Sequence, residues 1–180
     1  MTGRLSPSIV RIVAVAALLG AAPAVGSADT AQVAATAAYG PVTRLPLPRY
    51  VSMRADSANA RRGPGLDHRI DWEFVHRGQP LKVVAEYGQW RHVVDADGAG
   101  GWVHHSLLSG SRTAIVLGET PVVLRAGAGE TTAVRAMAEP GVVARLEACR
   151  DGWCAIRAGG FRGWVPRGRL WGVDPDETIE

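Results

Sequence analysis

The sequence has no sustained helical periodicity and no apolar run of membrane-spanning length. Its main hydrophobic stretch, residues 12–22, falls well short of the roughly twenty residues that a membrane-crossing helix needs. After this stretch, short segments rich in β-branched residues alternate with dense turn signals, and no 3.6-residue period persists. These absences exclude a helical membrane protein and predict an all-β chain.

The layout of the N-terminus is that of a secretory signal peptide. Arg4 and Arg11 lead into the uncharged stretch, and the small residues Gly26 and Ala28 stand three and one positions before a cleavage point ahead of Asp29. A permanent membrane anchor is the alternative, and the shortness of the stretch disfavours it. We therefore expect cleavage after Ala28, a periplasmic or secreted protein, and no stable membrane insertion after cleavage.

A large excess of charge of one sign is also missing. The formal net charge of the whole chain is +3, and it becomes +1 once the two arginines of the signal peptide are removed. So small an imbalance gives little support to a nucleic acid or another polyanion as the partner.

The rest of the chain contains one module of about sixty residues twice. Three ungapped blocks of the first copy match the second copy at offsets of 64, 63 and 62 residues, and the offset falls by one in stretches typical of loops. The matched blocks are Arg61-x-Gly63-x-Gly65 with Arg125-x-Gly127-x-Gly129, residues 78–90 with 141–153, and Gly101-Trp102-Val103 with Gly163-Trp164-Val165.

This repeat divides the chain into five segments. An Ala-, Thr- and Pro-rich stretch without a clear period follows the signal peptide and is expected to be a flexible linker. The acidic C-terminal tail is expected to be frayed. The segments are the signal peptide (1–28), the linker (29–48), domain 1 (49–112), domain 2 (113–173) and the tail (174–180).

Each module is expected to consist of short antiparallel strands. Residues 81–87 and 90–94 flank Gly88-Gln89, which predicts a hairpin with a type II′ turn, and residues 101–104 form the next strand after a turn at 95–100. In the second module Asp151-Gly152 favours a type I′ turn. About five such strands can close into a small barrel that hides its edges.

The two cysteines fit the geometry of this second hairpin. With Asp151-Gly152 as the turn, Cys149 and Cys154 become a directly opposed, non-hydrogen-bonded pair, whose Cα atoms lie roughly 4.5 Å apart. A disulfide accepts this distance, and an exported compartment allows it to form. The Cys-x4-Cys spacing and the lack of a nearby helix start disfavour a redox or nucleophilic cysteine. Domain 1 has Glu86 and Arg91 at these positions, where we expect an exposed ion pair of little energetic weight.

The tryptophans are expected to fill the barrels. A sixty-residue domain buries only about 60% of the surface of its chain, so it is marginally stable. We accordingly assign Trp102, Trp153 and Trp164 to the structural core.

These motifs resemble those of bacterial SH3-like (SH3b) domains. The resemblance covers about residues 47–173 and is carried by the Arg-x-Gly-x-Gly opening, the hairpin that ends in tryptophan, and the Gly-Trp-Val strand followed by a leucine. It implies two tandem, partly open SH3-like β-barrels that bind peptidoglycan or short peptides and do not catalyse a reaction. Domain 2 departs from domain 1 in carrying Pro166 where domain 1 has His104, so equivalent ligands cannot be assumed.

Catalytic and metal chemistry find little support in the sequence. His104-His105-Ser106 places histidine and serine side by side, but no nucleophile elbow accompanies them. Loop acids and solvated histidines explain the remaining clusters, and Asp95-x-Asp97-Gly98 lacks the distal glutamate of a calcium loop. No helix follows Arg61-x-Gly63-x-Gly65 to hold a phosphate. We therefore expect no catalytic residues, no metal and no cofactor.

The aromatic residues of domain 1 provide a candidate ligand site. Trp72 and Phe74 lie in a long loop that has no aromatic residue in domain 2, and their faces would suit sugar rings or peptide prolines. The alternative is that both residues cap the barrel core. The full set of candidate ligand-binding residues is Trp72, Phe74, Tyr87, Trp90 and His104.

Together these observations favour an exported, non-catalytic binding protein. The expected partner is peptidoglycan or a short peptide of the bacterial cell envelope. A scaffolding role with a protein partner in the envelope and a role as accessory of a cell-wall enzyme remain open.

Overall fold

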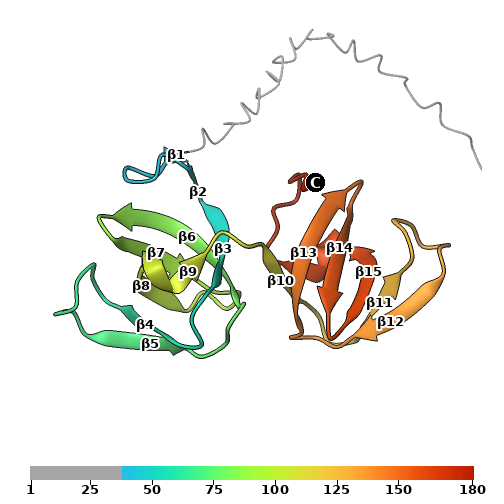
Figure 1. Cartoon of the computed structure of the whole chain (residues 1–180), viewed down its shortest axis with the longest axis horizontal. Helices are drawn as coiled ribbons and strands as arrows, with labels where there is room; N and C mark the ends of the chain where they lie inside the picture. The colour runs from blue at the N-terminus through green and yellow to red at the C-terminus, as the bar shows by residue number, and fades with distance from the viewer. Residues whose placement is uncertain (1–37) are drawn as a thin grey trace, which may run out of the picture. The chain divides into compact units, whose positions relative to one another are not determined.

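The computed structural model describes residues 38–180 (Figure 1). The expected signal peptide, residues 1–28, and the first part of the expected linker, residues 29–37, lie outside the described residues. Within the described part, no helix has the length and apolar character needed to cross a membrane.

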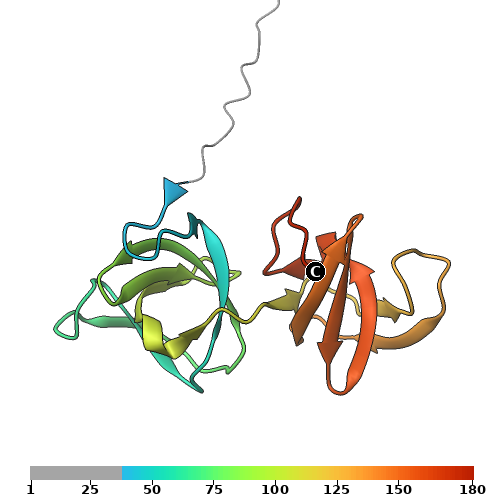
Figure 2. The same cartoon turned by 45° about the horizontal axis from the view of Figure 1, so that its top comes forward.

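Two seven-stranded antiparallel sheets dominate the described chain, and each curls into a small barrel (Figure 1, Figure 2). The strand order is β5-β4-β8-β7-β6-β3-β9 in barrel 1 and β12-β11-β15-β14-β13-β10-β16 in barrel 2. Each strand has its counterpart at the same place in the other sheet, as the sequence repeat predicts. The all-β prediction with two tandem barrels is therefore confirmed.

The strand bounds follow the repeat closely. Barrel 1 contains β3 (Arg49–Met53), β4 (Ala58–Arg61), β5 (Ile70–Phe74), β6 (Pro80–Tyr87), β7 (Trp90–Val94), β8 (Gly100–His104), the 3-10 turn η1 (His105–Leu107) and β9 (Leu108–Ser109). Barrel 2 contains β10 (Thr113–Val116), β11 (Val122–Arg125), β12 (Val134–Ala138), β13 (Val143–Arg150), β14 (Trp153–Ala158), β15 (Phe161–Pro166), the 3-10 turn η2 (Arg167–Arg169) and β16 (Leu170–Trp171).

The tight turns have the backbone angles that the sequence predicts. Gly88, in the turn between β6 and β7, has a φ of 49°, and positive φ at the first central residue alone is the mark of a type II′ turn. Asp151 and Gly152, between β13 and β14, have φ values of 51° and 75°. Both central residues of a type I′ turn require such values, so this turn needs residues that tolerate the left-handed region.

Aliphatic side chains fill both barrels, and this corrects the assignment of the tryptophans to the core. Successive side chains of a strand point to opposite faces, and in β8 it is Val103 that is fully buried while Trp102 lies half-buried on the outer face. Val165 and Trp164 divide in the same way in β15, and Trp153 is half-buried beside the buried Cys154. The core of barrel 1 is Met53, Ala58, Ala60, Phe74, Leu81, Val83, Val93, Val103 and Leu108.

The cysteines form the predicted disulfide. Cys149 and Cys154 are opposed across β13 and β14, and their Cα atoms lie 4.1 Å apart. In a non-hydrogen-bonded pair the N–H and C=O groups point away from the partner strand. Those of Cys149 bind Ile179 instead, with N···O distances of 2.9 and 3.2 Å.

The C-terminal tail is therefore not frayed, contrary to the sequence-based expectation. Besides the two backbone bonds at Ile179, the carboxylate of Glu177 accepts hydrogen bonds from both terminal nitrogens of Arg112, at 2.8 Å for Nη2. Val173 is buried in the core of barrel 2, and Ile179 packs against it. Acidic composition predicted solvent exposure, but Ile179 and the ion pair of Glu177 with Arg112, the residue before β10, fix the tail in place.

The end of the expected linker also has regular structure. β1 (Ala38–Tyr39) pairs with β2 (Pro46–Leu47), and the turn between these strands packs on barrel 1 through Glu86. A Cβ atom at Gly40 would lie 2.3 Å from the Glu86 carboxylate, so only glycine fits there without a shift. Residues 38–48 thus belong to the first barrel rather than to a flexible linker.

Glu86 and Arg91 take the place of the disulfide in barrel 1 and are buried, which corrects the expectation of an exposed ion pair. Only 6% of Glu86 and 7% of Arg91 is exposed. The carboxylate accepts hydrogen bonds from the backbone N–H groups of Val42 and Thr43 at 3.1 and 2.9 Å, from the Thr43 hydroxyl at 2.6 Å, and from Arg49 Nη2 at 2.7 Å. The N-terminal hairpin covers Glu86, whose side chain is fully buried.

These hydrogen bonds control the ionisation of Glu86. Burial by itself would raise the pKa of the carboxyl group, but the bonds from Thr43, Arg49 and Val42 outweigh burial and lower the pKa from 4.5 to about 2. The ionised form therefore stabilises the folded chain fully above about pH 4.5, and this contribution is lost as the pH falls toward 2.

We predict that Glu86→Gln weakens barrel 1 by about 3 kcal/mol at neutral pH, because Arg49 and Arg91 lose their buried counter-charge. The difference in unfolding free energy between the wild type and the variant should shrink between about pH 4.5 and 2, where the wild-type carboxylate becomes protonated. Urea titrations at a series of pH values measure this difference. A difference that stays constant over the range would show that the ionised carboxylate is not what the hairpin recognises.

The disulfide is expected to stabilise barrel 2 by about 2 kcal/mol, because it closes a short loop of the unfolded chain. The double variant Cys149→Ser/Cys154→Ser should therefore have a lower urea midpoint, and a reducing agent should shift the wild type to the same value. The double variant itself serves as the control, since its midpoint should not respond to the reducing agent. An unchanged midpoint in both experiments would contradict the prediction.

Candidate functional site

The outer face of barrel 1 carries a cluster of aromatic rings on β7 and β8. Trp90 lies opposite His104 and His92 lies opposite Trp102, because alternation sends all four side chains away from the core. The rings of Trp90 and His104 meet edge to face at 5.5 Å and 87°, and those of His92 and Trp102 at 5.2 Å and 76°. Such pairs hold the rings in a defined orientation. Tyr87, opposite Trp90 on β6, extends the cluster into solvent.

Beside this cluster lies a groove of about 190 Å³ at the end of β4. The Trp90 and His104 rings form one side, and the loop after β4 forms the other. Arg61 fixes this loop, since its Nη1 donates hydrogen bonds to the carbonyl oxygens of Leu66 at 2.9 Å and His68 at 2.7 Å. The complete lining, which we call groove 1, is Ser57, Ala58, Asn59, Arg61, Leu66, Trp90, His104 and Leu107.

Barrel 2 has a groove of about 210 Å³ at the equivalent place. Every residue that lines it is the counterpart of a groove 1 residue at the offsets of 64, 63 or 62 established by the sequence repeat. Arg125 holds the neighbouring loop through a 2.9 Å bond from Nη1 to the carbonyl of Thr132. This second lining, groove 2, is Pro121, Val122, Val123, Arg125, Glu130, Trp153, Pro166 and Arg169.

The two grooves share a tryptophan wall and an arginine that shapes the loop, but their chemistry differs elsewhere. Groove 1 has the exposed Leu66 where groove 2 has the exposed Glu130. His104 is replaced by Pro166, and Leu107 by Arg169, which is engaged with the carbonyls of Leu117 and Thr120 at 3.1 and 2.6 Å. The lining of groove 1 therefore contains no carboxylate, whereas that of groove 2 contains the carboxylate of Glu130.

The histidines near groove 1 do not form a catalytic arrangement in the described chain. His104 Nδ1 lies 2.8 Å from the Ser106 hydroxyl and 3.4 Å from the Ser106 backbone N–H, a contact that begins the 3-10 turn η1. Within residues 38–180 no carboxylate hydrogen-bonds the imidazole of His104, and Ser106 is its hydrogen-bond partner. Burial lowers the pKa of His92, and burial together with the charges of His104 and Arg91 lowers that of His105.

The acids and histidines considered for metal binding also have other roles in the structure. Asp71 accepts hydrogen bonds from Arg62 Nε at 3.0 Å and Arg69 Nε at 2.6 Å, and these bonds lower its pKa. Asp95 caps its own turn by accepting from the backbone N–H groups of Asp97 and Ala99 at 3.0 and 2.9 Å. No group of three or more His, Cys, Asp or Glu side chains suited to a metal ion occurs in the described residues.

The structure separates the five residues predicted to bind a ligand. It brings Tyr87, Trp90 and His104 together on the outer face. Phe74 is only 1% exposed and belongs to the core, so the capping alternative is correct for it. Trp72 is 47% exposed at the edge strand β5, on the side of the strand shared with Phe74, and lies outside groove 1.

Sequence analysis missed most of the groove lining. Arg61 stood out only as part of a glycine motif, and Asn59, Leu66 and Leu107 gave no signal in one copy alone. Of the eight lining positions, only Arg61 and Trp90 are retained in the second copy, as Arg125 and Trp153, so the repeat marks only these two.

Comparison with known proteins agrees with this architecture. The family described as "Bacterial SH3 domain" matches residues 54–110 and 118–172, one match for each barrel. The "Putative N-acetylmuramoyl-L-alanine amidase YrvJ" of Bacillus subtilis (strain 168) is 28% identical over 120 residues, which cover 61% of this chain. The chain spans only 23% of the length of that relative.

Two solved structures of Trichomonas vaginalis proteins show a looser likeness. NlpC2 is 12% identical, with 72% of this chain and 51% of that chain covered and a TM-score of 0.32. NlpC1 is also 12% identical, with 68% and 45% covered and a TM-score of 0.32. These scores are too low to indicate a common overall arrangement.

We predict that Arg61→Ala loosens the loop beside groove 1. The substitution removes two hydrogen bonds to loop carbonyls and should cost about 1 kcal/mol. Hydrogen exchange of the amides of residues 62–69 should accelerate severalfold, while exchange in β6 and β7 stays unchanged. Arg125→Ala is the matched control, and it should affect only the loop of barrel 2. Equal hydrogen-exchange rates of these amides in the wild type and in Arg61→Ala would contradict the role assigned to Arg61.

Proposed function

Because the chain belongs to the bacterial SH3 domain family, we propose that it is an exported, non-catalytic protein that binds bacterial cell-wall peptidoglycan or its peptides through grooves 1 and 2. The observation that carries this proposal is the repetition of the groove. Two copies that differ at most other surface positions retain the same tryptophan wall and the same loop-shaping arginine.

The chemistry of the grooves suits such a ligand. A tryptophan face buries much apolar area at low entropic cost and packs well against sugar rings or extended peptides. Leu66 in groove 1 favours an apolar ligand group, whereas Glu130 in groove 2 favours a ligand amine. A polymer that contains both groups could occupy both grooves of one chain, and the second contact would then gain from the first.

The relative from Bacillus subtilis supports a cell-wall ligand. The name of that relative refers to the bond between N-acetylmuramate and L-alanine, and this chain matches only part of that relative. The proposed role is therefore attachment to the wall rather than cleavage of that bond.

We predict that Trp90→Ala and Trp153→Ala each weaken retention on purified sacculi about tenfold, since each removes the aromatic wall of one groove. The double variant should lose retention at physiological salt, because binding through two linked sites is stronger than through one. Both rings lie outside the cores, so neither substitution leaves a cavity in a barrel.

Phe161→Ala is the control for this experiment. Phe161 is an exposed aromatic residue, 58% accessible, that lines neither groove. Its substitution should leave retention unchanged. A wild-type chain that is not retained, or a double variant that is retained like the wild type, would overturn the proposal.

A protein partner in the envelope is the second candidate function. Leu66, Ile70 and Trp72 are 78%, 45% and 47% exposed and lie close together in sequence, on the loop after β4 and on the edge strand β5. Exposed apolar side chains next to an unpaired strand edge are typical of protein contacts. Crosslinking in cells distinguishes the candidates, because a scaffold would yield one stoichiometric protein and no wall fragments.

A further inference from the structure

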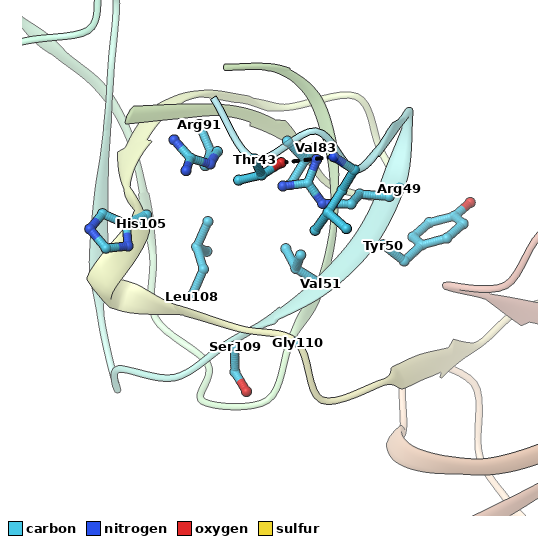
Figure 3. Close-up of a pocket in the computed structure, with 11 residues that line it drawn as sticks. Thr43, Arg49, Tyr50, Val51, Val83, Arg91, His105, Leu108, Ser109 and Gly110 are labelled. Atoms are coloured by element: carbon cyan, nitrogen blue, oxygen red, sulfur yellow. Dashed lines mark hydrogen bonds between the residues drawn. The ribbon is translucent and has the colours of Figure 1, made fainter. Parts of the chain in front are cut away.

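A second cavity opens in barrel 1, apart from groove 1 and sharing none of its lining residues. Its volume is about 350 Å³, within the range of roughly 300–1,000 Å³ typical of ligand sites. The N-terminal hairpin provides Thr43 and Leu45, β3 provides Arg49 and Val51, and the segment around β9 provides Leu108 and neighbouring residues (Figure 3). The hairpin and β3 come from the start of the barrel 1 sequence, and β9 comes from its end.

The floor of this cavity is apolar. Val83 and Leu108 are buried members of the barrel core, and Val51 packs against the same core. Gly110 lines the cavity without a side chain, and a Cβ atom added there would meet no heavy atom within 4 Å. A small aliphatic group therefore has both space and an apolar surface to cover.

Arg49 and Arg91 line the cavity, and the carboxylate of Glu86 beside it balances the charge of one of them. Glu86 Oε1 lies 2.7 Å from Arg49 Nη2 and 3.5 Å from Arg91 Nε. Arg91 Nη1 is engaged with the carbonyl oxygens of Gly88 and Trp90 at 2.9 and 2.8 Å. Arg49 Nη1 is buried and has no hydrogen-bond partner among the described residues. Figure 3 shows the guanidinium groups of both arginines near Thr43. Two guanidinium groups thus share one carboxylate beside the cavity, which leaves one positive charge in excess.

Barrel 2 shows what the equivalent arginine binds. In barrel 1, Arg49 on β3 lies opposite Val83 on β6. In barrel 2, the counterpart of Val83 is Leu146 on β13, and its N–H group donates a hydrogen bond to the carbonyl oxygen of Arg112. Arg112 is therefore the counterpart of Arg49. It holds the Glu177 carboxylate of the C-terminal tail with both terminal nitrogens.

The tail also covers the apolar surface of barrel 2 in this region. Val173 is part of the core, and Ile179 lies beside Cys149, which is the counterpart of Glu86. A segment that carries the Glu177 carboxylate and the aliphatic Ile179 thus packs on barrel 2 at this place, whereas in barrel 1 the N-terminal hairpin lies beside an open cavity.

We propose that the barrel 1 cavity binds the carboxylate end of a short peptide with small aliphatic side chains. The planar guanidinium of Arg49 would donate to the carboxylate, and the aliphatic group would cover Val51 and Leu108. A single surplus charge over an apolar floor matches a carboxylate better than a phosphate, which carries nearly two charges. This site does not depend on the proposed function of the grooves.

Titration of the full chain with N-acetyl-alanyl-alanine and with its C-terminal amide, followed by NMR, tests the site. The acid should cause saturable shifts at the amides of Val51, Leu108 and Gly110, and the amide should bind at least tenfold more weakly because it lacks the charge. Equal binding of acid and amide, shifts confined to groove 1, or no saturation at millimolar concentration would each overturn the proposal.

Two variants distinguish binding at the cavity from an effect on the fold and from binding at the grooves. Gly110→Leu places a side chain at the lining of the cavity and should weaken the shifts, whereas Arg49→Gln should abolish them by removing the charge. Phe161→Ala, at an exposed residue that lines neither the grooves nor this cavity, is the control and should bind the acid like the wild type. Sacculus retention of Gly110→Leu should stay unchanged, so failure at the cavity and failure at the grooves are distinguishable.

Discussion

The cross-strand pair next to the tight turn of each long hairpin connects the barrel to a segment outside it. Glu86 and Arg91 hold this position in barrel 1, and Cys149 and Cys154 hold it in barrel 2. Barrels of this size bury little apolar surface, so added constraints matter for their stability. In barrel 1 the constraint is a buried carboxylate that the N-terminal hairpin hydrogen-bonds, and in barrel 2 it is a covalent bond beside which the C-terminal tail pairs.

The two solutions respond differently to conditions. The carboxylate centre depends on protons, since acid removes the charge that Val42, Thr43 and Arg49 recognise. The disulfide depends on the redox environment instead. A duplicated fold thus keeps one architecture while its copies diverge in what holds them together, and a different terminal segment packs on each barrel.

The outer faces follow from the same alternation that builds the cores. Val103 and Val165 point inward, so the tryptophans beside them must point outward, where they stand next to the grooves. The Gly-Trp-Val motif therefore serves fold and surface at once. Its valine fills the barrel, and its glycine permits close approach of β4, since a Cβ atom at Gly101 would lie 2.7 Å from the Arg61 carbonyl oxygen.

The sequence alone determined the repeat, the all-β class, the hairpin turns and the disulfide, because each depends on residues close together in the chain. Asp151-Gly152 and the alternation around it are local signals, and they place Cys149 opposite Cys154 without further information. Only the tertiary structure decided that Glu86 is buried, that residues 38–48 and the tail are ordered, and which residues line each groove. Glu86 and Thr43 are 43 residues apart, and Arg112 and Glu177 are 65 apart. Contacts over such separations depend on how the closed barrel brings distant segments together. A pattern of neighbouring residues in the sequence does not predict which distant segments meet.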